Sequence, residues 1–179
     1  MTRNVVNLDA LLPRANLDAP PAGSTADIHG LKIADLEPGL IYNWLRKPDF
    51  QRETASWSPE QVADLIATFA TGNIIPAVVL WQNGQSVFVI DGAHRLSALI
   101  AWARDDYGAG SISAPHYGNV IPDHQKKMHE ETRALVHGGV GSYRHHQLAA
   151  QFPQNADRAM LARASQFAFR NIEIQWIRV

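Results

Sequence analysis

Residues 77–90 constrain the fold of this chain most, because they have the pattern of a β-hairpin. The runs AVVLW (77–81) and SVFVI (86–90) are rich in β-branched and aromatic residues, which favour strands. Between them, QNGQ contains Asn83-Gly84, the favoured two-residue turn of a hairpin. An isolated hairpin is marginally stable in water. The sequence therefore predicts a small sheet covered by other elements.

Helices are predicted on both sides of the hairpin. Ser58 can cap a helix over residues 59–71, with Pro59 at its first position and Gln61 completing a capping box. Apolar residues at helical spacing predict a second helix over 93–106. Later patterns predict helices over 121–139, 142–152 and 155–169 and a strand over 172–179. We therefore predict an α+β fold: a small mixed β-sheet with packed helices and a C-terminal helical extension.

The length and composition are those of one globular domain. The chain has 179 residues, of which 46% are hydrophobic and 18% are charged. Residues 1–26, rich in Pro, Ala and Asp, are expected to form an N-terminal arm. Residues 27–179 are expected to form a single domain, with a core over 27–106 and a helical extension over 107–179. The last predicted strand stops at the final residue, as in one module of a longer protein.

Several classes of function are excluded or disfavoured by composition. The chain has no cysteine, which excludes disulfides, thiolate catalysis and cysteine-based zinc sites. Its formal net charge of −1 does not by itself indicate binding to nucleic acid or to a membrane surface. No apolar run approaches the roughly 18 residues of a membrane span, so a cytoplasmic protein is expected. The eight histidines lack the spacing of zinc ligands, which favours surface histidines.

The junction of the hairpin and the second helix is a candidate anion site. Gly92 permits a positive φ, and the amides from Ala93 onward have no intrahelical partner. These amides carry the positive end of the helix dipole, which suits a phosphate. Arg95 would add a bidentate contact and His94 a proton donor or phosphate contact. Asp91 could cap the helix, hold Arg95, accept a bond from a sugar hydroxyl or hold a metal.

Spacing alone favours a purely structural interpretation of this junction. An aspartate before a helix is an ordinary N-cap, and Arg95 in the first turn would then pair only with Asp91. The alternative is a ligand site, whose mouth Ser97 would also reach, five residues after Gly92.

A second polar stretch shifts the balance towards a ligand. The run FQRETASW (50–57) carries Gln51, Arg52 and Glu53 just before the predicted 59–71 helix, where packing requires none of them. Alone, Arg52 would be a solvated surface charge. Near a phosphate site it would supply the other half of an arginine clamp.

Together these stretches resemble a known family. FQRETASW, then GNIIPAVVLW, then VFVIDGAHRLSALIAW resemble the N-terminal domain of the ParB/sulfiredoxin superfamily. The most similar subgroup is that of the DGQQR and DGQHR domains of bacterial DNA restriction and phosphorothioation systems, such as the GmrSD-type enzymes. In these domains an aromatic-Gln-Arg element precedes a helix, a Gly-to-Pro turn, a hairpin and Asp-Gly-x-x-Arg. The resemblance covers roughly residues 27–106.

The resemblance implies binding of a nucleotide, with hydrolysis or use as a conformational switch. Phosphate-binding roles are implied for Gly92, Ala93, Arg95, Arg52 and Ser97. Catalytic roles are implied for Asp91, His94 and Gln51, and Asp91 and Glu53 are candidate ligands of a divalent metal. The implied ligand is ATP, GTP or CTP, with Mg²⁺.

Departures from the family pattern narrow the expectation. Position 93 is Ala, where sulfiredoxins have a cysteine and ParB proteins a catalytic glutamate. Sulfinic acid repair is therefore excluded, and nucleotide hydrolysis is expected to be weaker than binding.

Three hypotheses follow. The first is a nucleotide-binding, NTP-hydrolysing regulatory module of a bacterial DNA defence or DNA-processing protein. This module would contact DNA directly or through a partner subunit, and it could form a homo-oligomer. The second is a ParB-like metal-dependent DNase in which Asp91 and Glu53 hold the metal. The third is a non-catalytic DNA-binding or assembly module.

Overall fold

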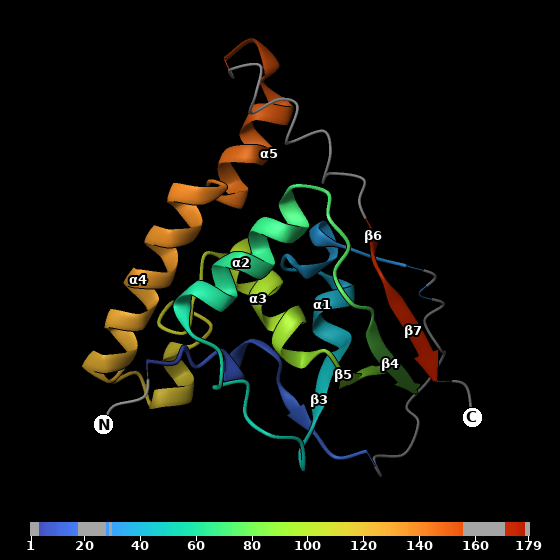
Figure 1. The fold of residues 1–179 in the computed structure, drawn as a ribbon. Helices are drawn as coiled ribbons and strands as arrows, with labels where there is room; N and C mark the ends of the chain where they lie inside the picture. The colour runs from blue at the N-terminus through green and yellow to red at the C-terminus, as the bar shows by residue number, and fades with distance from the viewer. Residues whose placement is uncertain (1–3, 18–27, 29, 156–170, 178–179) are drawn as a thin grey trace.

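The computed structural model describes residues 4–17, 28, 30–155 and 171–177, which form an α+β fold around a five-stranded mixed sheet (Figure 1). The strand order is β1 (Arg14–Ala15), β3 (Leu45–Pro48), β5 (Ser86–Asp91), β4 (Val78–Asn83) and β7 (Ile174–Ile177). Strands β2 (Leu31–Lys32) and β6 (Asn171–Ile172) pair separately. The predicted fold class is confirmed.

The β4–β5 hairpin is antiparallel, as predicted, but its turn lies one residue later than expected. Asn83 pairs with Ser86, so Gly84 and Gln85 form the turn instead of Asn83 and Gly84. Gly84 has φ 60°, and a glycine at the first central position is typical of a turn that matches the twist of a hairpin. The other neighbours in the sheet, β1 with β3, β3 with β5 and β4 with β7, are parallel.

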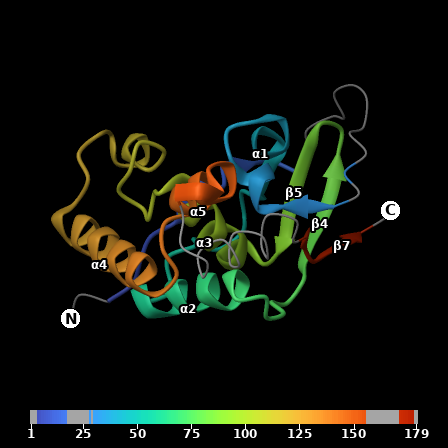
Figure 2. The same cartoon turned by 90° about the horizontal axis from the view of Figure 1, so that it is seen from above.

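The helices lie beside the sheet, seen from above in Figure 2. They are α1 (Leu40–Trp44), α2 (Pro59–Ala70), α3 (Ala93–Arg104), α4 (Asp123–Gly139) and α5 (Tyr143–Gln151). In the described residues the short 3-10 segments are η1 (Asp9–Leu11), η2 (Ile33–Leu36), η3 (Ala114–Tyr117) and η4 (Pro153–Asn155). The capping box of Ser58 and Gln61 is confirmed. The helix predicted over 155–169 lies outside the described residues, apart from residue 155.

Helix α3 is the central helix of the domain. Every residue from Leu96 to Trp102 is buried, and the helix packs on η1, η2, α2, α5 and β4. The indole Nε1 of Trp102 donates a hydrogen bond to the carbonyl of Gly141 at 3.0 Å. Because burial of each large apolar side chain contributes about 1.5–3 kcal/mol, the helix is firmly held. Its N-terminus therefore has a fixed position.

The expected N-terminal arm differs from the structure over its described part, residues 4–17. Val6, Leu8, Leu11 and Leu12 are buried in the core. The amide of Val6 donates to the carbonyl of Trp57 at 2.8 Å. The physical reason is that the run VVNLDALL is largely apolar. Packing this segment against the core removes its apolar surface from water, whereas an extended arm would leave that surface exposed.

Asp106 organises the first part of the loop over residues 107–121, which lies between α3 and α4. Its carboxylate accepts hydrogen bonds from the amides of Gly108, Gly110, Ile112 and Ser113, and from the Ser113 hydroxyl, all at 2.8–3.1 Å. Asp106 is 1% exposed. A buried carboxylate that satisfies several amides gives a loop a defined conformation without regular secondary structure.

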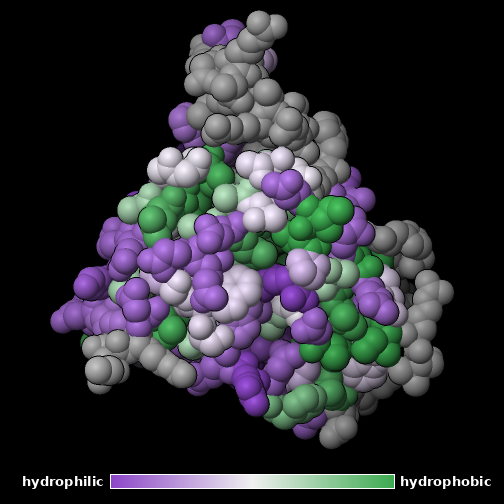
Figure 3. Space-filling view, in the orientation of Figure 1, coloured by the Kyte–Doolittle hydropathy of each residue, from purple (hydrophilic) through white to green (hydrophobic). Residues whose placement is uncertain are grey.

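The surface is divided by hydropathy. In Figure 3, hydrophilic residues cover the side of α4, and hydrophobic residues gather over the side of β4 and β7. Within the described part of the chain, no helix has both the length and the apolar character needed to cross a membrane.

Candidate functional site

Parallel pairing of β3 and β5 brings the two predicted constellations together. Because the strands are parallel neighbours, their carboxyl ends meet at the same edge of the sheet. The loop 49–57 follows β3, and Asp91-Gly92 ends β5 and leads into α3. The side-chain amide of Gln51 joins the two, since its Nε2 donates to the carbonyls of Val89 at 3.2 Å and Ile90 at 2.8 Å.

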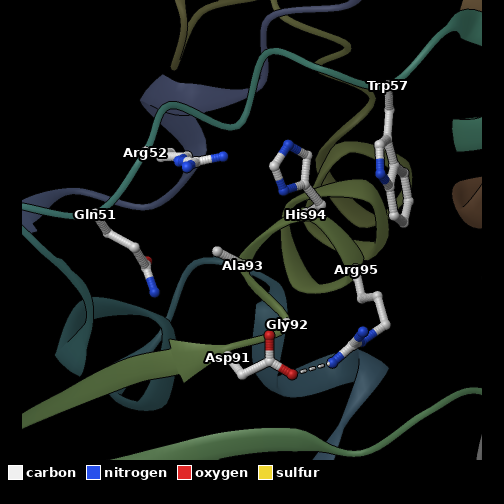
Figure 4. Close-up of a pocket in the computed structure, with 8 residues that line it drawn as sticks. All are labelled: Gln51, Arg52, Trp57, Asp91, Gly92, Ala93, His94 and Arg95. Atoms are coloured by element: carbon white, nitrogen blue, oxygen red, sulfur yellow. Dashed lines mark hydrogen bonds and ion pairs between the residues drawn. The ribbon is translucent and has the colours of Figure 1, made fainter.

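A pocket of about 360 Å³ lies between these segments (Figure 4). It is lined by Gln51, Arg52, Trp57, Asp91, Gly92, Ala93, His94 and Arg95. The lining thus contains all the predicted site residues except Ser97 and Glu53. Trp57 packs against the core and also forms one wall of the pocket.

Gly92 forms the turn into α3 and is its N-cap, with φ 91°. A Cβ at this position would lie 3.0 Å from Nη2 of Arg95 and 3.1 Å from Cγ2 of Val78. Both the positive φ and the close packing therefore require glycine. The first amides of α3 have no partner within the helix, so they are available to an anion.

Arg95 stabilises this turn through hydrogen bonds to its neighbours. Its Nη2 donates to the carbonyl of Ala77 at 3.0 Å and to Oδ2 of Asp91 at 2.8 Å. This is the pairing that the structural interpretation of the junction predicted. Asp91 does not cap α3, because Gly92 occupies the N-cap and no side-chain cap is formed. The guanidinium of Arg95 is thus engaged with the protein, although its Nε is buried without a hydrogen-bond partner in the described structure.

Arg52 is the freer cation of the two. It is exposed, and in Figure 4 its side chain extends from the loop towards His94. Among the residues that the structure describes, its guanidinium makes no hydrogen bond or ion pair. The pocket therefore has a free guanidinium on one side and the N-terminus of α3 on the other.

His94 is held by two consecutive residues of the loop. Its Nε2 lies 2.9 Å from Oγ of Ser56, and its ring stacks on Trp57 with centroids 5.5 Å apart and planes at 30°. Burial lowers the pKa of His94, and the positive charges of Lys47 and Arg95 add to this, against the opposing effect of Asp9. The lowered pKa favours the neutral imidazole.

A buried ion pair supports the loop from the other side. Lys47, at the end of β3, donates to Oδ1 of Asp9, which also accepts from the amide of Thr54 at 2.8 Å. Burial alone would raise the pKa of Asp9, but the hydrogen bonds from Lys47 and Thr54 and the charges of Lys47 and Arg14 lower it overall. Burial lowers the pKa of Lys47, and Asp9 partly offsets this. The pair fixes Thr54 relative to the core.

Arg14 ties the N-terminal segment to the same loop. Its Nη1 donates to the carbonyls of Asp49 and Gln51, both at 2.7 Å, and its Nη2 lies 3.2 Å from Oδ2 of Asp9. None of Asp9, Arg14 or Lys47 was singled out from the sequence. Charged residues of these types are common in any sequence, so nothing in the sequence marks these three. Only their contacts in the structure show that they hold the loop.

Two predicted site residues lie elsewhere. Ser97 is 0% exposed, and its Oγ has no hydrogen-bond partner in the described structure, because this side of α3 faces the core. Glu53 is exposed and is not part of the pocket lining. The described residues contain no cluster of three or more His, Asp or Glu side chains arranged to hold a metal.

The fold and the site define an α+β domain with a polar pocket. On one side of the pocket the turn at Gly92 leads into the buried helix α3, and on the other side lies the loop that carries Gln51 and Arg52. The family model of the GmrSD restriction endonuclease N-terminal domain matches residues 34–175. This match spans most of the chain, which therefore belongs to that family. No curated protein and no solved structure matches the chain. The restriction-system part of the resemblance is confirmed, and the wider relation to ParB and sulfiredoxin stays a prediction.

Proposed function

We propose that this domain binds a nucleoside triphosphate in the pocket and acts as a regulatory module of a DNA restriction protein. The family supports the restriction context. The observation that carries nucleotide binding is the placement of Arg52 across one pocket from the N-terminus of α3, a helix of 12 residues. The volume of the pocket, about 360 Å³, lies within the usual range for small-molecule sites.

Each lining group has a separate role in this proposal. The amides at Gly92 and Ala93 bind phosphate oxygens, and Arg52 approaches the same phosphates from the loop. Arg95 acts mainly by holding the turn, since its Nη2 is already engaged. Gln51 is oriented by its two bonds to β5, and its Oε1 is a buried acceptor without a partner in the described structure. It can therefore accept a bond from a water molecule or a sugar hydroxyl.

Mg²⁺ would accompany the nucleotide through Asp91. Among the described residues of the pocket lining, Asp91 is the one carboxylate, and its side chain is 69% exposed. A single carboxylate together with substrate phosphates is a usual way for proteins to hold Mg²⁺. The ion would neutralise phosphate charge. Glu53 lies outside the lining and is not included in this role.

Thermal-shift measurements with ATP, GTP and CTP, each with and without Mg²⁺, test the proposal. Wild-type protein is expected to be stabilised by at least one nucleotide. Arg52→Ala should weaken binding about tenfold or more, as expected for loss of a charged hydrogen bond. Arg144→Ala is the matched control, because Arg144 is exposed on α5 and outside the pocket lining. No stabilisation by any nucleotide, or equal stabilisation of wild type and Arg52→Ala, contradicts the proposal.

DNA is the proposed macromolecular partner, contacted directly or through a second subunit. The DNase alternative, with Asp91 and Glu53 on a metal, is separated by its own response. Metal-dependent nicking of plasmid without any nucleotide-induced stabilisation would favour it. Plasmid binding without either response would favour the non-catalytic DNA-binding or assembly module.

A further inference from the structure

Ser56 makes a contact that nucleotide binding does not require. Its Oγ lies 2.9 Å from Nε2 of His94, and the residue is exposed. Ser58, two residues later, differs: its hydroxyl donates to Glu60 and accepts from the amide of Gln61 to cap α2. Ser56 precedes the helix and caps nothing. The hydroxyl of Ser56 therefore remains accessible beside an imidazole.

The pair has the geometry of a nucleophile and its base. Nε2 of His94 lies within hydrogen-bond distance of the Ser56 hydroxyl and can accept its proton, and burial, which lowers the pKa of His94, favours the neutral imidazole. The stacked ring of Trp57 fixes the plane of the imidazole. The proton acceptor is thus oriented by one residue and hydrogen-bonded to the next.

Groups that can stabilise a transferring anion line the same pocket as His94. His94 is the second residue of α3, whose first-turn amides have no partner within the helix. Figure 4 shows Arg52 facing His94 across the pocket. Amides and a guanidinium placed around a phosphoryl group are the usual source of electrostatic catalysis of its transfer. Ser56 is not among the described residues of the lining, and its Oγ lies 2.9 Å from Nε2 of His94, which is.

We propose that Ser56 is a phosphoryl acceptor and His94 its general base. This inference rests on the proposed binding of a nucleoside triphosphate. In the step, Oγ of Ser56 attacks the γ-phosphorus, and the bond from that phosphorus to the bridging β,γ-oxygen breaks. The bridging oxygen keeps the electron pair and leaves with the nucleoside diphosphate. The Ser56 proton passes to Nε2 of His94, and the products are phosphoserine 56 and the diphosphate.

Rapid-quench labelling tests the step. The full chain is mixed with γ-³²P-labelled ATP, GTP or CTP and Mg²⁺, quenched at times from milliseconds to minutes, and mapped by peptide mass spectrometry. Acid-stable label on Ser56 is expected. Ser56→Ala should abolish it, and His94→Gln should slow it about 100-fold, as loss of a general base does. Ser111→Ala, at an exposed serine of the 107–121 loop, is the control and should label like wild type.

The outcomes separate this inference from the function on which it rests. Nucleotide-induced stabilisation without label on Ser56 at any quench time overturns the phosphoryl-acceptor role and leaves nucleotide binding intact. Acid-labile label on His94, with none on Ser56, overturns it also. Absence of both stabilisation and label overturns the proposed function together with the inference. A Ser56→Ala variant that keeps nucleotide-induced stabilisation but loses label supports the inference and excludes misfolding as the cause.

Discussion

Lys47 and Asp9 form an ion pair inside the domain, where the lysine side chain is 0% exposed and the carboxylate 5% exposed. The two residues are 38 positions apart and join the end of β3 to the N-terminal segment. Through Thr54, the pair also fixes the loop that carries Arg52. The loop of the candidate site is thus held by charges that lie outside the pocket lining.

Asp9→Ala is expected to destabilise the domain strongly. The substitution leaves the Lys47 ammonium buried without its carboxylate, which typically costs about 3–5 kcal/mol. Urea denaturation measures the change in the free energy of unfolding. Asp123→Ala is the matched control, since its pair with Lys126 at 3.0 Å is exposed and should contribute little. Equal midpoints for the two variants would contradict the assigned role of the buried pair.

Acid should weaken the fold through the same carboxylate. The pKa of Asp9 is lowered in the folded protein: burial raises it, but the bonds from Lys47 and Thr54 outweigh that effect. A lowered folded pKa stabilises the protein above the ordinary value of 3.8, and this stabilisation is lost as pH falls through the folded pKa. Unfolding free energies at a series of pH values down to that range should fall less steeply for Asp9→Asn than for wild type. Parallel curves would show that other groups carry the acid sensitivity.

Gly92→Ala is expected to destabilise the protein more than Gly118→Ala. Both glycines have positive φ, 91° and 59°, so each alanine incurs about 1–2 kcal/mol of backbone strain. A Cβ at Gly118 meets nothing within 4 Å, whereas one at Gly92 meets Arg95 and Val78 at 3.0–3.1 Å. Thermal denaturation of the two variants isolates the packing cost. Gly92→Ala should also lower nucleotide affinity, because the turn carries the phosphate-binding amides.

Asp106→Asn should loosen the loop that follows α3. The amide side chain has one acceptor oxygen in place of two, so several of the bonds to residues 108–113 are lost. We expect a destabilisation of about 1–3 kcal/mol. Hydrogen exchange should show faster exchange for the amides of Gly110 and Ile112. The amides of α2 serve as an internal reference and should keep their protection.

Local patterns were sufficient to predict much of this fold. The capping box before α2, the two runs of the hairpin and the apolar spacing of α3 each lie within a short stretch, and all three elements are confirmed. Strand β3 was not predicted, because Lys47 and Pro48 are atypical of a strand in the middle of a sheet. Its lysine is tolerated only because Asp9, far away in the sequence, neutralises it.

The candidate site, like the fold, was predicted where its signals are local and was missed where they depend on residues far apart in the sequence. Gly92, Arg95 and Arg52 were predicted from motifs, and the structure places all three in one pocket. Ser56 was not singled out, because its significance comes from a hydrogen bond to His94, 38 residues away. Ser97 was expected at the mouth from its distance to Gly92 along the chain, but the turn of α3 directs it into the core.

The anchoring of the 49–57 loop has a consequence for how this domain could diverge. Gln51 is fastened to β5 and Thr54 to Asp9, whereas Arg52 and Glu53 between them are exposed. Of these two, Arg52 lines the pocket, so its substitution can change the charge of the pocket lining without disturbing either anchor. The stretch between the anchors is therefore the place where descendants of one ancestral domain could acquire different ligand preferences while inheriting the same scaffold.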